Sequence, residues 1–176
     1  MKKIILIIAL IVIALFFFMN TKKEPFKFRR NFVTGAPSIF NQEGEKISPR
    51  HIVSKDYVFL YFSASWCGPC HAFNPRLIDW YNSNDGGNNF EIVLVGADSD
   101  STSIRQYFND QKFPFTAMEK KGKIFSDLFE AYCGPGIPSL VLLNKDDEVV
   151  ASSYQNGKYV GPDYPLKYYE ENIKPH

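Results

Sequence analysis

The sequence predicts an α/β fold with a central mixed β-sheet flanked by helices, and an N-terminal membrane helix in front of it. Two mainly apolar runs, at 57–62 and 90–95, are each followed by apolar residues at helical spacing. This pattern is typical of buried strands that alternate with helices in a parallel sheet. Two further strands, at 139–143 and 148–153, are separated by four residues and therefore form an antiparallel pair. The combination indicates a mixed sheet.

Length and composition indicate one globular domain behind a short N-terminal segment. The chain has 176 residues, of which 45% are hydrophobic and 22% charged, and this composition excludes a disordered chain. The first thirty residues hold seven Lys or Arg against one acid, whereas the remainder holds thirteen against eighteen. The folded part is therefore acidic and lacks the basic surface that binds phosphate backbones, so no nucleic-acid partner is expected.

The N-terminal segment is predicted to be directed to a membrane. Residues 4–19 form a run of sixteen residues without a charge, which as a helix spans about 24 Å, between a signal-peptide core and a short anchor. The run ends in bulky residues at 15–19, unlike the small residues of a cleavage site. We expect a transmembrane anchor or uncleaved signal over 1–20, a basic tether over 21–35 and the folded domain over 36–176.

The charges around this segment favour two opposite orientations. Five Lys or Arg at 22–30 follow the apolar run, against two lysines before it, and this excess favours a cytoplasmic domain. A short basic start that leads straight into an apolar run is instead the general form of a secretory signal. We expect a single-pass protein whose folded domain is extracytoplasmic, on the periplasmic side, with a cytoplasmic-facing domain as the alternative.

The elements of the first half follow from turns and periodicity. A turn-prone centre divides 38–47 into a small hairpin. After the strand at 57–62, apolar residues recur at helical spacing over 70–81, in a helix that contains a proline. After the strand at 90–95, aspartates near the start of 98–108 can cap a second helix.

The elements of the second half are shorter. An amphipathic stretch occupies 125–129, and the strand at 139–143 turns at 144–147 into the strand at 148–153. A closing helix is predicted over 164–173.

A Cys-x-x-Cys motif, Cys67-Gly68-Pro69-Cys70, lies where the first buried strand ends and the helix after it begins. A cysteine at a helix N-terminus lies at the positive end of the helix dipole, which stabilises its thiolate. We therefore expect Cys67 to be the nucleophile. Cys70 is one helical turn away and can attack a mixed disulfide on Cys67, which releases the reduced target and closes an internal disulfide.

The motif has three other interpretations. A structural zinc site needs about four ligands, and the chain offers one further cysteine and three scattered histidines, so no metal is expected. A purely structural disulfide across two residues closes too small a loop to add much stability. Cys67 to Cys70 followed by His71 also matches the c-type haem attachment signature. Haem attachment stays open as an alternative, but no cofactor is expected, because a buried strand and Trp66 precede the motif.

The segment 62–75, FSASWCGPCHAFNP, resembles the thioredoxin superfamily and, within it, the tryparedoxin and nucleoredoxin type. In that type an aromatic strand runs into Ser-Ala-Ser-Trp-Cys, and a proline follows the second cysteine by five residues. The segment 136–140, GIPSL, is similar to the family's loop with a cis-proline that faces the active site. The resemblance covers about residues 36–170 and implies a thioredoxin-like fold.

The resemblance also implies a role for each matching residue. Cys67 would be the attacking thiolate and Cys70 the resolving thiol. Trp66 would form an apolar platform for the incoming disulfide. Pro138 would be cis and would leave the backbone of Ile137 free to pair with the substrate chain in a strand-like contact.

The sequence departs from compact thioredoxins in three places. Tyr61 stands where those proteins carry a buried acid that transfers protons, so water or another group must serve, and Asp98 is a candidate. A helix-containing segment at 101–125 is inserted and could shape partner choice. Cys133, five residues before Pro138, is either a spare buried thiol or a secondary redox thiol.

These observations together predict a membrane-anchored thiol-disulfide oxidoreductase that reduces disulfides in protein substrates by dithiol exchange. Gly-Pro between the cysteines resembles the reducing members of the family. An upstream dithiol electron donor is implied, because each turnover leaves the enzyme oxidised. A partner-binding module that uses the same surface without turnover is the alternative from another class.

Overall fold

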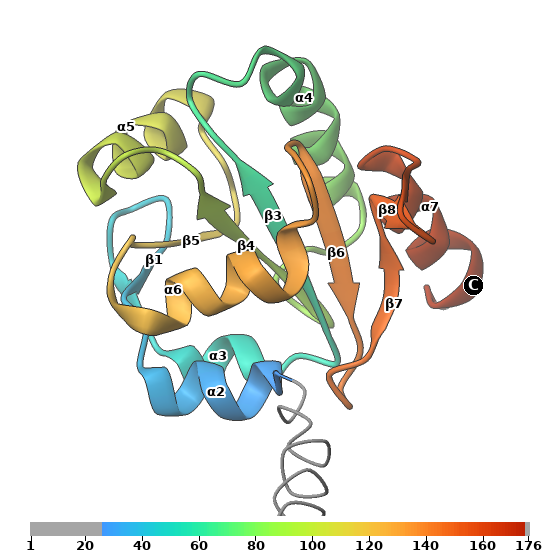
Figure 1. Cartoon of the computed structure of the whole chain (residues 1–176), viewed down its shortest axis with the longest axis horizontal. Helices are drawn as coiled ribbons and strands as arrows, with labels where there is room; N and C mark the ends of the chain where they lie inside the picture. Colours follow the sequence, from blue (N-terminus) through green and yellow to red (C-terminus); the bar gives the residue numbers. More distant parts are fainter. Residues whose placement is uncertain (1–25, 175–176) are drawn as a thin grey trace, which may run out of the picture.

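A computed structural model describes residues 26–174 and confirms the predicted α/β fold with a central mixed sheet flanked by helices (Figure 1). The elements in chain order are α2 (Phe28–Gly35), β1 (Ile39–Phe40), β2 (Lys46–Ile47), α3 (Pro49–Val53), β3 (Tyr57–Ser63), α4 (Gly68–Ser83), β4 (Phe90–Gly96), α5 (Ser101–Gln111), β5 (Thr116–Met118), α6 (Gly122–Leu128), the π-helix η1 (Phe129–Cys133), β6 (Ser139–Leu143), β7 (Val149–Ser152), β8 (Tyr154–Gln155), β9 (Lys158–Tyr159) and α7 (Asp163–Asn172).

The main sheet has seven strands in the order β2-β1-β5-β4-β3-β6-β7. The strands β3, β4 and β5 run parallel, whereas β6 runs antiparallel to β3 and β7 antiparallel to β6. The predicted hairpin at 38–47 is present as β1 and β2, which pair antiparallel at one edge of the sheet. The parallel centre and antiparallel edges are the mixed arrangement that the sequence predicted.

Aromatic side chains on β3 show which helices cover each face of the sheet. Phe59 packs edge-on against Trp80 of α4, with ring centroids 5.4 Å apart, and against Tyr169 of α7 at 5.8 Å. Phe62 points to the other face and packs against Phe129 of η1 at 5.0 Å. Side chains of a strand alternate between faces, so α4 and α7 cover one face and α6 with η1 covers the other. Figure 1 shows α6 crossing in front of the strands.

One helix lies inside the segment that the sequence analysis assigned to a basic tether. α2 buries Phe28 and Phe32, and the rings of these two residues contact each other at 4.8 Å. The guanidinium group of Arg29 donates hydrogen bonds to the backbone carbonyls of Asn144, at 2.7 Å, and Lys55, at 2.6 Å. These contacts attach residues 28–35 to the domain. Arg29 and Arg30 lie on a helix that buries the rings of Phe28 and Phe32.

The predicted membrane segment over 1–20 lies outside the described residues. Within residues 26–174, no helix has both the length and the apolar character needed to cross a bilayer.

Candidate active site

The two cysteines of the Cys-x-x-Cys motif lie at the start of α4, immediately after β3. Cys67 has an extended backbone conformation and is the N-cap residue of the helix, and its Sγ accepts a hydrogen bond of 3.2 Å from the backbone N–H of Cys70. The two sulfurs form a disulfide of 2.02 Å, with Cα atoms 5.2 Å apart. Pro69 occupies the first turn, where a missing N–H leaves no helical hydrogen bond unmade. A helix N-terminus of this kind stabilises negative charge on the sulfur of the N-cap residue.

Burial distinguishes the two cysteines. Cys70 is fully buried, whereas Cys67 keeps 4% of its surface exposed. Trp66, directly before it, is 68% exposed, the highest fraction among the large apolar side chains of residues 26–174. Of the two cysteines, Cys67 is therefore the one with residual exposure, and the exposed ring of Trp66 precedes it in the chain.

The loop before β6 closes the other side of the site. The peptide bond between Ile137 and Pro138 is cis, as the resemblance implied. Ile137 packs against the buried cluster of Ala64, Cys67 and Cys70. The register explains this approach, since β6 starts opposite the end of β3, where the motif begins. The structure thus brings Trp66, Ile137 and both cysteines together.

Asp98 holds the loop that leads into the motif. Its buried carboxylate accepts hydrogen bonds from the backbone N–H of Ser65, at 3.1 Å, and from the Ser65 hydroxyl, at 2.6 Å. The Ser65 carbonyl lies 2.6 Å from Nε2 of His71, which must carry the proton because a carbonyl only accepts. Three atoms of Ser65, its backbone nitrogen, its Oγ and its carbonyl oxygen, are therefore hydrogen-bonded. Ser65 lies two residues before Cys67. The role of Asp98 in proton transfer stays a prediction.

A buried polar network lies under the active-site helix, and the sequence analysis did not single it out. The Tyr61 hydroxyl donates to Asn74 Oδ1 at 2.7 Å, and Asn74 Nδ2 donates to the Tyr107 hydroxyl at 2.9 Å. The Tyr107 hydroxyl also bonds the hydroxyl of Ser63 at 2.7 Å. Burial raises the pKa of Tyr61 and of Tyr107, so both hydroxyls stay neutral. Asn74 follows Cys70 by one helical turn, and that spacing was the available signal.

Cys133 is a free thiol in η1 and is buried. Burial raises the pKa of this thiol to about 11, so it is protonated at neutral pH and weakly nucleophilic. Its assignment as a secondary redox thiol stays a prediction.

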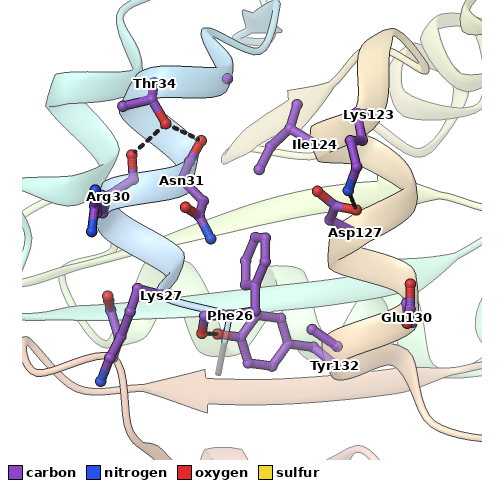
Figure 2. A pocket seen from close by; sticks show the side chains of 13 residues that line it. Phe26, Lys27, Arg30, Asn31, Thr34, Lys123, Ile124, Asp127, Glu130 and Tyr132 are labelled. Atoms are coloured by element: carbon purple, nitrogen blue, oxygen red, sulfur yellow. Dashed lines mark hydrogen bonds and ion pairs between the residues drawn. The ribbon is translucent and has the colours of Figure 1, made fainter. Parts of the chain in front are cut away.

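A cavity of about 990 Å³ lies away from the cysteines, between α2 and the helices α6 and η1 (Figure 2). Its walls carry charges of both signs, and Lys123 forms an ion pair with Asp127 there. None of the predicted site residues lines it. Nor do residues 26–174 contain a group of three or more His, Cys, Asp or Glu side chains placed to hold a metal ion.

Comparisons with known proteins agree with this geometry. A family model described as thioredoxin-like matches residues 55–149. Tryparedoxin of Trypanosoma brucei brucei is 30% identical over 139 residues, which cover 76% of this chain and 94% of the relative. Probable nucleoredoxin 1 of Arabidopsis thaliana is 35% identical over 115 residues, which cover 64% of this chain and 19% of that longer relative. The solved structure of tryparedoxin I from Leishmania major superposes with a TM-score of 0.63 at 26% identity, covering 84% of this chain and 98% of the other.

Proposed function

Because the chain belongs to the thioredoxin-like family, we propose that it is a thiol-disulfide oxidoreductase that reduces disulfide bonds in protein substrates by dithiol exchange. The observation that carries this proposal is the position of Cys67. It is the N-cap of α4, its sulfur accepts the N–H of Cys70, and Cys70 is close enough to form the internal disulfide. These are the two requirements of dithiol exchange, a stabilised thiolate and a resolving partner.

The reaction starts from the reduced pair. The Cys67 thiolate attacks one sulfur of the substrate disulfide, which forms a mixed disulfide and releases the other substrate sulfur as a thiolate. Cys70 gives its proton to a water molecule or to another group, for which Asp98 is the candidate, and its thiolate attacks the Cys67 sulfur. The second substrate thiolate leaves, the substrate has gained two electrons, and the Cys67–Cys70 disulfide of the present structure remains. An upstream dithiol then returns two electrons to the enzyme.

The surroundings of the cysteines support a protein substrate. Trp66 is largely exposed beside Cys67, and Ile137 packs against the cysteine pair from the opposite loop. An incoming polypeptide can place an apolar side chain on the indole ring and pair its backbone with that of Ile137. Because Cys70 is buried, the disulfide within its reach is the mixed disulfide on Cys67, so Cys70 attacks the Cys67 sulfur.

A membrane anchor over residues 1–20 and an extracytoplasmic domain belong to the same proposal. The uncharged run at 4–19 and its basic start support them. We expect the full chain to stay in the membrane pellet after an alkaline carbonate wash, and a C-terminal reporter that is active only outside the cytoplasm to give signal. Release by carbonate, or a reporter active only in the cytoplasm, would contradict the anchor or the orientation.

The reduction of insulin by dithiothreitol tests the enzymatic proposal. The wild-type protein is expected to shorten the lag before insulin precipitates, and Cys67→Ser is expected to abolish this effect. Cys133→Ala is the matched control, since it removes a cysteine outside the motif. No acceleration by the wild type, or equal acceleration by Cys67→Ser, would instead indicate a binding module without turnover.

A further inference from the structure

A small hairpin formed by β8 and β9 lies beside the loop that carries Ile137 and Pro138. Its two strands pair antiparallel across a two-residue connection, Asn156-Gly157. Both connecting residues have positive φ, 50° and 76°, which the tightest hairpin turns require and which Asn-Gly adopts readily. The hairpin is therefore a short rigid unit, inserted between the last strand of the sheet and α7.

Two tyrosine hydroxyls connect this hairpin to the loop. The Tyr154 hydroxyl donates to the carbonyl of Gly136 at 3.2 Å, and the Tyr159 hydroxyl donates to the carbonyl of Pro138 at 3.0 Å. The two rings contact each other, with centroids 5.1 Å apart. The backbone is thus held on both sides of Ile137, the residue that packs against the cysteines.

The loop itself is shaped for this contact. Gly134 has a φ of 78°, and a Cβ built there would lie 2.6 Å from Cδ2 of Tyr154. A Cβ at Gly136 would lie 3.3 Å from the Tyr154 hydroxyl oxygen. The ring of Tyr154 therefore lies directly against loop backbone, an approach that a glycine permits and a larger residue at 134 would prevent.

Exposed apolar side chains lie at the end of the hairpin. Tyr159 is 49% exposed and Val160 is 47% exposed. With Trp66 they make up three of the five large exposed apolar side chains among residues 26–174. The Tyr159 hydroxyl bonds the carbonyl of Pro138, and the neighbouring Ile137 packs against the cysteine pair, so Tyr159 lies at the same loop as the residue that contacts the sulfurs. Tyr159 and Val160 are adjacent in the chain and both about half exposed, and neighbouring exposed apolar side chains of this kind indicate a contact surface.

We propose that the β8–β9 hairpin is the recognition element for protein substrates, and that its partner is an extended polypeptide segment with an apolar side chain next to the reacting cysteine. Tyr154 and Tyr159 act as positioning residues, which hold the backbone of Ile137 in place for strand-like pairing with that segment. Val160 and the ring of Tyr159 contact its side chains. The inference rests on the proposed function, since it concerns the substrate of the same cysteines.

The test compares a protein disulfide with a small one that has no backbone to pair. The full chain is reduced, freed of reductant and mixed with insulin or with 5,5′-dithiobis(2-nitrobenzoate), and the second-order rate constant of its oxidation is measured for each. The ratio of the insulin constant to the small-disulfide constant is expected to fall about fivefold or more in Tyr154→Phe/Tyr159→Phe, the effect of losing one hydrogen bond or more. Val160→Ser should lower the same ratio. Tyr164→Phe is the matched control and should keep the wild-type ratio.

Each other outcome overturns the proposal in a recognisable way. A wild-type ratio in the double variant and in Val160→Ser would show that the hairpin does not contact the substrate. An equal loss with both substrates would show that the hairpin supports the cysteines instead. A wild-type chain that reacts with the small disulfide but not with insulin would leave dithiol exchange intact and refute recognition of polypeptides, whereas a chain that reacts with neither would refute the proposed function itself. Val160→Ser changes an exposed side chain, so it provides the comparison even where the tyrosine variant is destabilised.

Discussion

Glu91 is a buried carboxyl group whose replacement by glutamine is expected to make the protein more stable at neutral pH. It lies at the start of β4, and its Oε1 accepts hydrogen bonds from the Tyr81 hydroxyl at 3.0 Å and from the backbone N–H of Ile92 at 2.9 Å. Burial raises the pKa of Glu91 to about 7, although these two hydrogen bonds and the charge of Lys55 act against the rise. A glutamine keeps the acceptor oxygen and removes the charge.

The sign and size of the effect follow from linkage between proton binding and folding. The pKa of Glu91 is about 7 in the folded state against an ordinary 4.5, so between these values the folded protein binds more protons than the unfolded chain. Stability therefore falls as the pH rises through this window. This difference between the folded and the ordinary pKa corresponds to about 3 kcal/mol in the free energy of unfolding. We expect Glu91→Gln to match the wild type near pH 4 and to exceed its free energy of unfolding by up to about 3 kcal/mol at pH 8.

Urea denaturation of both proteins at a series of pH values between 4 and 8 measures this difference. Glu119→Gln, followed down to pH 2, is a control of opposite sign, because hydrogen bonds from Arg105 help to lower the pKa of Glu119 to about 2, so its stabilisation is present at neutral pH and is lost between about pH 4.5 and 2. A difference between Glu91→Gln and the wild type that stays constant with pH would refute the reasoning. Glu91 pairs with Val58 at the start of β3, so insulin reduction should keep its pH profile in the variant.

Three further substitutions test single contacts. Asp98→Ala frees the N–H and hydroxyl of Ser65, and the rate of insulin reduction is expected to fall about tenfold while the thermal midpoint shows that the fold persists. Tyr61→Phe leaves the buried Oδ1 of Asn74 without its donor, which should cost about 1–2 kcal/mol of stability in urea denaturation. Phe32→Ala empties a fully buried position of α2 and should cost about 3–5 kcal/mol; a cost near zero would mean that α2 is not part of the folded unit.

The strands at the centre of the sheet could be predicted because they are buried on both faces. β3, β4 and β6 are continuous runs of buried residues, and such runs stand out without any knowledge of their partners. β5 has only three residues, too few to show a period, and it exists because β4 offers a parallel edge for it. Residues 28–35 follow basic residues typical of a tether, but Phe28 and Phe32 are spaced four apart on one helix face, and this spacing is the local signal for α2.

The cysteine pair and the cis-proline of the candidate site could be located from the sequence as well, whereas the residues that hold them could not. Cys67, Cys70 and Pro138 belong to motifs that are local in the sequence. The contacts of Tyr159 and Asp98 join positions 21 and 33 residues apart, and no local pattern marks such pairs. The turn at 156–157 is different, because Asn-Gly is a strong local signal for a tight hairpin, although β8 and β9 are not among the predicted elements.

The mixed direction of the strands explains why the site assembles where it does. β4 is parallel to β3, so its last residue, Gly96, pairs with Ser63 at the end of β3, and Asp98 follows directly to bind the loop before the cysteines. β6 is antiparallel, so its first residue, Ser139, pairs with Phe62 at the same end, and the loop of Ile137 precedes it. The two neighbours of β3, the strands β4 and β6, therefore each place a loop at the end of β3 where α4 begins. Substitutions at this end of the strands should change catalysis, and those at the opposite end, such as Glu91, should change stability alone.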